Sequence, residues 1–142
     1  PTAPLAISRL VNIFPEYQRE GIRQQVASTI EAVVAQQILP RFDAAGMVAA
    51  AEVMLATPAI RNLIREGKEH QIYNVIQTNR NWGMQTMDQA LADLVQQGQI
   101  SQEEALGHGI DKGELQRLLL KKTASVTASS GSLMREREFM DL

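Results

Sequence analysis

Two apolar runs separated by a short loop constrain the fold of this chain more than any other feature. The run at residues 32–39 is apolar on both faces, contains β-branched side chains and stops at Pro40, and a second apolar run follows at 47–55. Asp43 and Gly46 lie between the runs, as is typical of a hairpin loop. The alanine content of both runs leaves helix as the competing interpretation. We predict two antiparallel strands.

Helical periodicity precedes this hairpin. A helix is predicted over residues 4–14, because apolar side chains recur at i, i+3, i+4 and i+7. This stripe consists of Ile7, Leu10, Val11 and Phe14. Pro15 ends the first helix and can open a second one that runs to about residue 30, with an apolar side chain at every fourth position.

Capping signals after residue 56 predict a series of short helices. Thr57 and Pro58 are an N-cap and a first-turn proline, and Gly67 stands where a left-handed C-terminal residue belongs. Further helices are predicted over 70–79, 86–98, 101–109 and 111–120. The predicted fold class is therefore α+β and mostly helical, with a β-hairpin followed by a C-terminal bundle of short helices.

The chain is expected to divide into three parts. Residues 1–56 hold two helices and the hairpin, and residues 57–120 form a helical subdomain. Residues 121–142 are expected to be a flexible tail, because residues 123–132 are rich in Ser and Thr and nearly lack large apolar side chains.

Composition excludes several classes of protein. The 142 residues contain no Cys, which excludes disulfides and thiolate chemistry, and no apolar stretch is long enough to cross a membrane. A net charge of -2 argues against a nucleic-acid partner. No secretory signal opens the chain, which begins at Pro1 and is expected to be a piece of a longer protein.

Motifs of catalysis are missing from the sequence. It contains neither a phosphate loop nor a dinucleotide-binding glycine motif, and no nucleophile elbow. Its two histidines, His70 and His108, do not form a zinc motif. The sequence therefore predicts no catalytic residue, no cofactor-binding residue and no metal ligand.

The segment from Thr57 to Lys68 carries the most distinctive pattern. Its predicted helix has one apolar stripe and an opposite polar face, on which Arg61 and Arg65 are like-charged i,i+4 neighbours. One interpretation is a solvated face with cations near the C-terminal helix dipole. The other is an arginine pair that meets carboxylates on a partner or a neighbouring subunit.

From residue 59 to residue 68 the sequence reads AIRNLIREGK, which resembles the signature of the type IV pilus twitching-motility ATPases, the PilT-like retraction motors. Other strings that resemble this family occur in the same order along the chain. They are VNIFP at 11–15, ILPR at 38–41, VAAAEVML at 48–55, HQIYNVIQT at 70–78 and GMQTMDQAL at 83–91. The resemblance covers residues from about 5 to about 120, and the ordered set is far more specific than any single string.

The resemblance implies a longer, cytoplasmic, ATP-driven motor of the type II/IV secretion ATPase superfamily. Such a motor is a homo-hexamer that uses ATP and Mg, and it is associated peripherally with the inner membrane through the type IV pilus machinery. Residues 1–56 would then be the C-terminal part of its RecA-like core, with the hairpin as the terminal strands of the sheet. This chain lacks the phosphate loop, so it is expected to hold no cofactor and not to hydrolyse ATP alone.

In the resembled family, AIRNLIREGK is tied to pilus retraction rather than to nucleotide contact. The resemblance places this coupling role on ten residues. They are Ala59, Ile60, Arg61, Asn62, Leu63, Ile64, Arg65, Glu66, Gly67 and Lys68. The three large apolar residues are expected to pack the helix, and the exposed candidates for coupling are Arg61, Arg65, Glu66 and Lys68.

Three other side chains have competing interpretations. Glu52 is expected to pair with Arg41 across the hairpin, and a nucleotide or subunit contact is the alternative. Trp82 is expected to cap the helical core, with an exposed contact as the alternative. His70 is expected at the surface, and a sensor of nucleotide state at a helix junction is the alternative.

Other functions compete with the motor fragment. One is a stand-alone, non-catalytic protein-interaction module, and another is a fragment of a pilus-extension or type II secretion ATPase. A DNA-binding helix-turn-helix over residues 86–119 is disfavoured, because its acidic side chains would repel phosphates. A phosphate loop encoded upstream of Pro1 would distinguish the motor from the interaction module.

Overall fold

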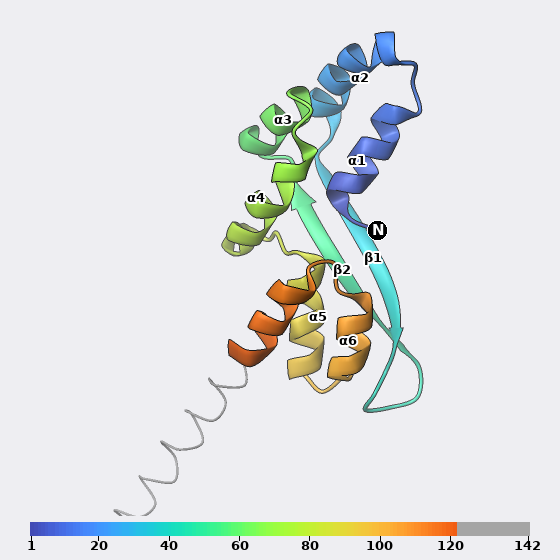
Figure 1. Ribbon diagram of the computed structural model, residues 1–142, viewed down its shortest axis with the longest axis vertical. Helices are drawn as coiled ribbons and strands as arrows, with labels where there is room; N and C mark the ends of the chain where they lie inside the picture. Colours follow the sequence, from blue (N-terminus) through green and yellow to red (C-terminus); the bar gives the residue numbers. More distant parts are fainter. Residues whose placement is uncertain (122–142) are drawn as a thin grey trace, which may run out of the picture.

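A long antiparallel hairpin is the axis of the molecule (Figure 1). The computed structural model describes residues 1–121. Strand β1 (Ala32–Pro40) pairs with β2 (Met47–Leu55) in a register that runs from Ala32 opposite Leu55 to Pro40 opposite Met47. The loop closes with an N–H of Arg41 donated to the carbonyl of Gly46 at 3.0 Å. The predicted hairpin is confirmed.

The two faces of the hairpin differ. Alternate residues of β1 and β2 point inward and are buried, among them Leu39 and Met54, because successive side chains of a strand point to opposite faces. On the outer face Val34 and Ile38 are 62% and 50% exposed. Within the described residues, the other elements therefore pack against the inner face of the hairpin.

Two helices precede the hairpin. Helix α1 (Ala3–Asn12) begins at an N-cap, Thr2, and α2 (Glu16–Thr29) follows Pro15, which stands at its N-cap position. Ile7 and Val11 are buried as predicted, but Leu10 is 43% exposed, so the predicted stripe is too wide.

Short helices follow the hairpin, as predicted. They are α3 (Pro58–Arg65), the 3-10 turn η1 (Glu69–Gln71), α4 (Ile72–Thr78), the 3-10 turn η2 (Arg80–Trp82), α5 (Met87–Gln96) and α6 (Gln102–His108), and residues 112–121 are also helical. Thr86 and Gln89 form the predicted capping box of α5. At α6 only the first half of the predicted box is made, because the Glu104 carboxylate contacts His108 instead.

The buried apolar side chains form two clusters. The helices that carry them lie toward opposite ends of the hairpin (Figure 1). The first, named here the α3 cluster, comprises Ala3, Ile7, Ala27, Met54, Ile60, Ile64, Ile72, Ile76 and Met84. The second, the α5 cluster, comprises Leu39, Ala50, Met87, Ala90, Leu91, Ala92, Ile100, Ala105, Leu115 and Leu119. The α3 cluster joins residues from both sides of residue 56, and the expected division there stays a prediction.

Two further expectations concern the periphery. Trp82 is 72% exposed, so the prediction that it caps the core is wrong. It is the last residue of the 3-10 turn η2, which is capped by Gly83 in the left-handed region (φ 90°), and this tight turn leaves the indole outside the packed helices. The predicted flexible tail, apart from residue 121, lies outside the described residues.

Candidate functional site

Helix α3 forms as its sequence predicts. The hydroxyl of Thr57 accepts a hydrogen bond from the N–H of Ile60, Pro58 opens the helix, and Gly67 takes the left-handed φ of 70° just beyond its end. Ile60 and Ile64 are fully buried in the α3 cluster, and each contributes roughly 1.5–3 kcal/mol to folding. The apolar stripe of AIRNLIREGK therefore fixes the orientation of its polar face.

Arg61 does not lie on the exposed face where it was predicted. Its guanidinium donates to the carbonyls of Ala56 at 3.0 Å and Ala27 at 2.7 Å, and it pairs with Glu31 at 3.2 Å. Only 21% of the side chain is exposed. The prediction failed because α2 packs against α3 and presents its last carbonyls to the guanidinium, a contact that the helical periodicity of α3 alone does not show. Arg61 is a clamp between α2, α3 and the start of β1.

A second arginine makes the reciprocal contact. Arg23 of α2 donates to the carbonyl of Ile64 at the end of α3 at 3.5 Å, and it forms an ion pair with Glu69. The guanidinium lies beside Gly67, where an added Cβ would be in ordinary van der Waals contact with its Cζ at 3.5 Å, so the positive φ and not the space favours glycine there. Each helix thus sends one arginine to carbonyls at the end of the other, where the helix dipole favours a cation. We call Arg23 and Arg61 the arginine clamp.

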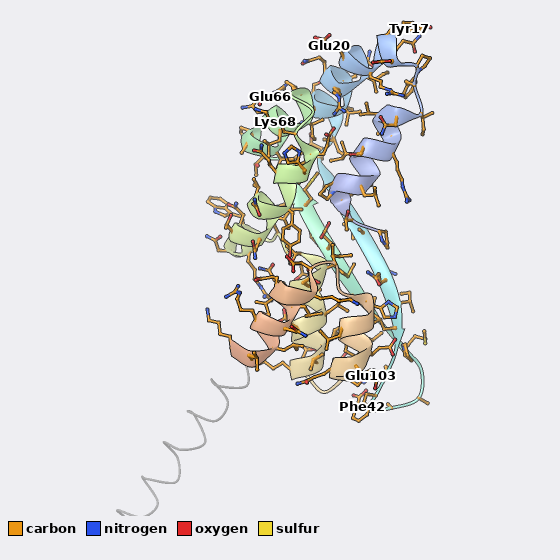
Figure 2. All side chains as sticks on the ribbon, viewed as in Figure 1. Tyr17, Glu20, Phe42, Glu66, Lys68 and Glu103 are labelled. Atoms are coloured by element: carbon orange, nitrogen blue, oxygen red, sulfur yellow. The ribbon has the colours of Figure 1, made fainter. Side chains whose placement is uncertain are left out.

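Asn62, Glu66 and Lys68 stay on the surface, and Arg65 is half-buried beside them. Arg65 donates to the side-chain oxygen of Asn62 at 2.9 Å, and Lys68 pairs with Glu66 at 2.7 Å. Figure 2 shows Glu66 and Lys68 on the outer side of this helix, away from the hairpin. These four residues form the outward face of the motif, which we call the α3 surface.

Glu52 occupies a position that the sequence did not predict. The carboxylate is fully buried on the inner face of β2. Its Oε1 accepts from the N–H of Ala3 at 2.7 Å, and its Oε2 accepts from the N–H of Met87 at 3.2 Å. Ala3 and Met87 are the first residues of α1 and α5, so two helix N-termini share one carboxylate. Burial raises the pKa of Glu52, and these two N–H donors oppose that shift.

The predicted pair between Glu52 and Arg41 is wrong. Residue 41 lies beyond the last pair of the ladder, and Glu52 stands opposite Ala35. Arg41 binds Asp43 within the hairpin loop instead, at 2.7 Å and 2.9 Å. The strand register therefore separates the two predicted partners.

A second buried carboxylate follows on α5. Asp88 is fully buried and accepts from the N–H of Ile110 at 2.8 Å, the N–H of Asp111 at 3.0 Å and the hydroxyl of Tyr73 at 3.0 Å. Burial, and then the charge of Asp88, raise the pKa of Tyr73. Glu52 and Asp88 together, the carboxylate pair, hold α1, α4, α5 and the loop before the last helix at the junction of the two clusters.

Comparisons with known proteins show relatives of this chain among the pilus retraction proteins. The chain is 45% identical over 103 residues to a twitching motility protein of Neisseria gonorrhoeae, covering 72% of this chain and 28% of the relative. It is 42% identical over 104 residues to the type IV pilus retraction ATPase PilT of Pseudomonas aeruginosa, covering 73% of this chain and 30% of the relative. No family model matches the chain.

Among solved structures, the chain matches the pilus retraction motor PilT with bound ADP. The TM-score is 0.71 at 37% identity, over 81% of this chain and 32% of that one. The chain is homologous to the C-terminal portion of the pilus retraction ATPases. It spans less than a third of the length of these relatives. The predicted fold class and family resemblance are confirmed.

The described part of this PilT-like chain contains neither a cluster of metal ligands nor a helix that could span a membrane. Within residues 1–121, no three acidic or histidine side chains gather to hold a metal ion, and no helix is long and apolar enough to span a membrane. His70 lies on the surface, as predicted. The candidate site consists of two sets of contacts between helices, the arginine clamp and the carboxylate pair, and one outward polar face, the α3 surface.

Proposed function

We propose that this chain acts as the C-terminal part of an ATP-driven motor that retracts type IV pili. The observation that carries the proposal is the AIRNLIREGK helix, α3, standing on a fold that matches the PilT retraction motor. The identity of 42–45% to proteins named for twitching motility and pilus retraction supports it.

In this proposal the nucleotide is bound elsewhere in the motor. ATP with Mg would be held by residues outside this chain, which has no phosphate loop. The PilT structure with bound ADP supports a nucleotide-driven motor. We therefore expect no ATP hydrolysis by the purified 142-residue chain, and measurable turnover by it would contradict this assignment.

We propose that the ten residues Ala59 to Lys68 couple hydrolysis to pilus disassembly. The arginine clamp supports this role, because it ties α3 to α2 so that the two helices move together. The α3 surface is the part left to meet a neighbouring subunit or a pilus component. Arg61 acts by positioning α3, and Arg65, Glu66 and Lys68 are the coupling residues.

The assembled motor would be a homo-hexamer on the cytoplasmic side of the inner membrane, bound peripherally to the pilus machinery. Nucleic acid is not a proposed partner, since the chain carries a net charge of -2. The proposed division of the chain at residue 56 places the hairpin with the ATPase core and α3 with the helical subdomain.

A chimera tests this function. The C-terminal portion of Pseudomonas aeruginosa PilT is replaced by this chain, and twitching is measured in a strain that lacks its own PilT. We expect twitching to be restored, and Arg65→Ala together with Lys68→Ala in the chimera to abolish it at unchanged protein level. Glu103→Gln, on an exposed site of α6 far from α3 (Figure 2), is the control that keeps twitching. A stable, hexameric chimera that hydrolyses ATP without restoring twitching would contradict the retraction role.

A further inference from the structure

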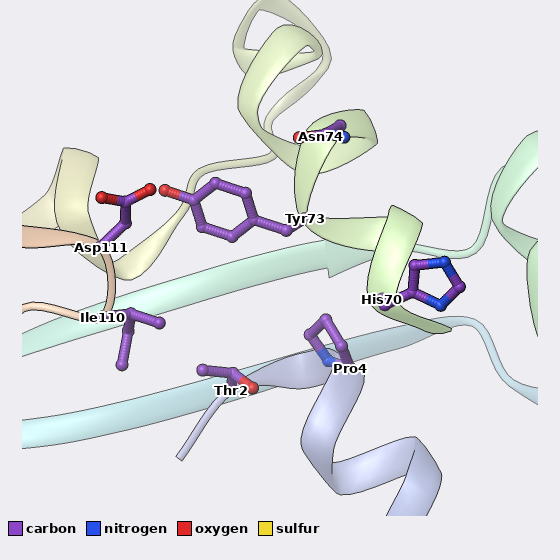
Figure 3. A pocket seen from close by; sticks show the side chains of 7 residues that line it. All are labelled: Thr2, Pro4, His70, Tyr73, Asn74, Ile110 and Asp111. Atoms are coloured by element: carbon purple, nitrogen blue, oxygen red, sulfur yellow. The ribbon is translucent and has the colours of Figure 1, made fainter. Parts of the chain in front are cut away.

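A cavity of about 340 Å³ opens where α1 begins, beside α4 and the loop that precedes the last helix. Figure 3 shows Pro4 and Thr2 on one side, the ring of Tyr73 and the carboxylate of Asp111 on another, and Ile110 between them. The volume is at the lower end of the range for ligand pockets, and it suits a group of side-chain size.

The lining of this cavity combines apolar walls with one acidic end. Pro4, Ile110 and the ring of Tyr73 supply apolar surface, and the carboxylate of Asp111 supplies the charge. His70 borders the cavity from the 3-10 turn before α4 and is exposed. A ligand that fits this lining has an apolar stem and a cationic end.

The carboxylate of Asp111 is available to such a cation. Its Oδ1 accepts the N–H of Glu114 at 3.0 Å, and no ion pair to Asp111 is formed within residues 1–121. The hydroxyl of Tyr73 is held by Asp88 at 3.0 Å, so the ring is fixed in place and stays neutral. An aromatic face beside a carboxylate favours a planar cation, which can stack on the ring and bind the oxygen together.

We propose that this cavity binds an arginine side chain of a partner protein, with its methylenes against Pro4 and Ile110 and its guanidinium between Tyr73 and Asp111. Pro4 belongs to α1, whose helix packs in the α3 cluster, and Ile110 and Asp111 precede the helix that packs in the α5 cluster. The bound side chain would therefore contact both halves of the molecule. This site is separate from the α3 surface and does not depend on the retraction function.

The test uses the 142-residue chain and two probes, Nα-acetyl-arginine amide and its neutral isostere Nα-acetyl-citrulline amide. Amide chemical shifts are followed by NMR at pH 8, where an ordinary imidazole carries no charge. We expect saturable shifts centred on the amides of Tyr73, Asn74 and Ile110, with a dissociation constant on the order of 1 mM for arginine amide. Citrulline amide should bind about fivefold more weakly or not at all.

Two variants locate the charge. Asp111→Asn keeps an N-cap for the last helix, since Asn caps as well as Asp, and should weaken arginine binding about fivefold. Glu103→Gln removes the same charge from a distant exposed site of α6 and should leave binding unchanged.

Three results would overturn the proposal. They are equal binding of the two probes, shifts scattered over the surface, and equal weakening by both variants. The comparison of the two probes needs no variant, so it decides even if Asp111→Asn were to misfold. Self-association of the chain that Asp111→Asn abolishes would assign the cavity to a second copy instead of a different partner.

Discussion

The arginine clamp and the carboxylate pair connect helices by opposite means. At α3, guanidiniums that are about one-fifth exposed reach carbonyls at helix C-termini. At α5, fully buried carboxylates reach N–H groups at or just before helix N-termini. Both arrangements place a charge where the helix dipole favours it. They differ in solvent access: water can replace a lost arginine contact, whereas a lost carboxylate leaves buried donors unpaired. The α3 end of the molecule is therefore the easier one to remodel.

The largest expected loss of stability comes from a change in the buried carboxylate pair. Asp88→Ala leaves the N–H groups of Ile110 and Asp111 and the hydroxyl of Tyr73 without their acceptor, and should lower the free energy of unfolding by about 3 kcal/mol. Urea denaturation measures the change. Asp88→Asn retains one acceptor oxygen and should lose roughly half as much. A loss below about 1 kcal/mol for Asp88→Ala would show that water reaches these donors.

Glu52→Gln tests the carboxylate pair through the pH dependence of the unfolding free energy. The amide of glutamine cannot accept hydrogen bonds from both N–H groups. We therefore expect the free energy of unfolding to fall by about 2 kcal/mol at acidic pH. Because the folded-state pKa of Glu52 is raised, its contribution is fully present below the unfolded value and declines as the pH rises through the folded value.

The gap in unfolding free energy between the wild-type chain and Glu52→Gln should therefore shrink as the pH rises from about 4.5 towards 7. Urea denaturation of both proteins across this range measures it, and taking the difference cancels the titration of most other groups. A gap that widens with pH would mean that the N–H donors outweigh burial at this carboxylate.

Arg61→Ala probes the arginine clamp, which is partly exposed to water. It removes two hydrogen bonds to carbonyls and one ion pair, and we expect the unfolding free energy to fall by about 1–2 kcal/mol. Amide hydrogen exchange should rise in the last turn of α2 more than in α5. Arg61→Lys should recover only part of the loss, because an ammonium cannot reproduce the geometry of the guanidinium. Equal loss of protection in α2 and α5 would contradict a local clamp.

Arg65→Ala should have the smallest effect on stability, within about 0.5 kcal/mol, because its contact with Asn62 is near the surface. In the chimera with PilT the same change should nevertheless reduce twitching strongly. Thermal unfolding and twitching are measured on the same variant. Reduced twitching with an equal fall in stability would place Arg65 with the clamp rather than with the α3 surface.

Local signals predicted most of the fold. The capping box at Thr86, the proline after Thr57 and the hairpin loop containing Gly46 act through neighbouring residues, and the structure confirms the elements they delimit. The ordered family strings predicted the homology, which the comparisons support.

The connections between elements were not predicted. Glu52 binds Ala3, 49 positions away, and Arg61 binds Ala27, 34 positions away, so no local pattern joins them. One available signal was an acidic residue inside an apolar strand, since a buried carboxylate requires partners. Asp88 stands in the first turn of α5, where an acidic residue is common, and two of its partners come from the loop before the last helix, more than 20 positions away.

The hairpin has a closed end at its loop and an open end where β1 begins and β2 finishes, and the arginine clamp lies at the open end. Arg61 binds Ala27, Glu31 and Ala56, residues just before β1 and just after β2. A force that pulled α2 away from α3 would load this ladder in the unzipping direction, one pair of residues at a time from Ala32 and Leu55. The Arg61 guanidinium connects the segments before β1 and after β2, where separation of the strands would begin. Arg61, which the sequence suggested as a residue that transmits motion, thus stabilises the open end of the β1–β2 ladder against separation of the strands.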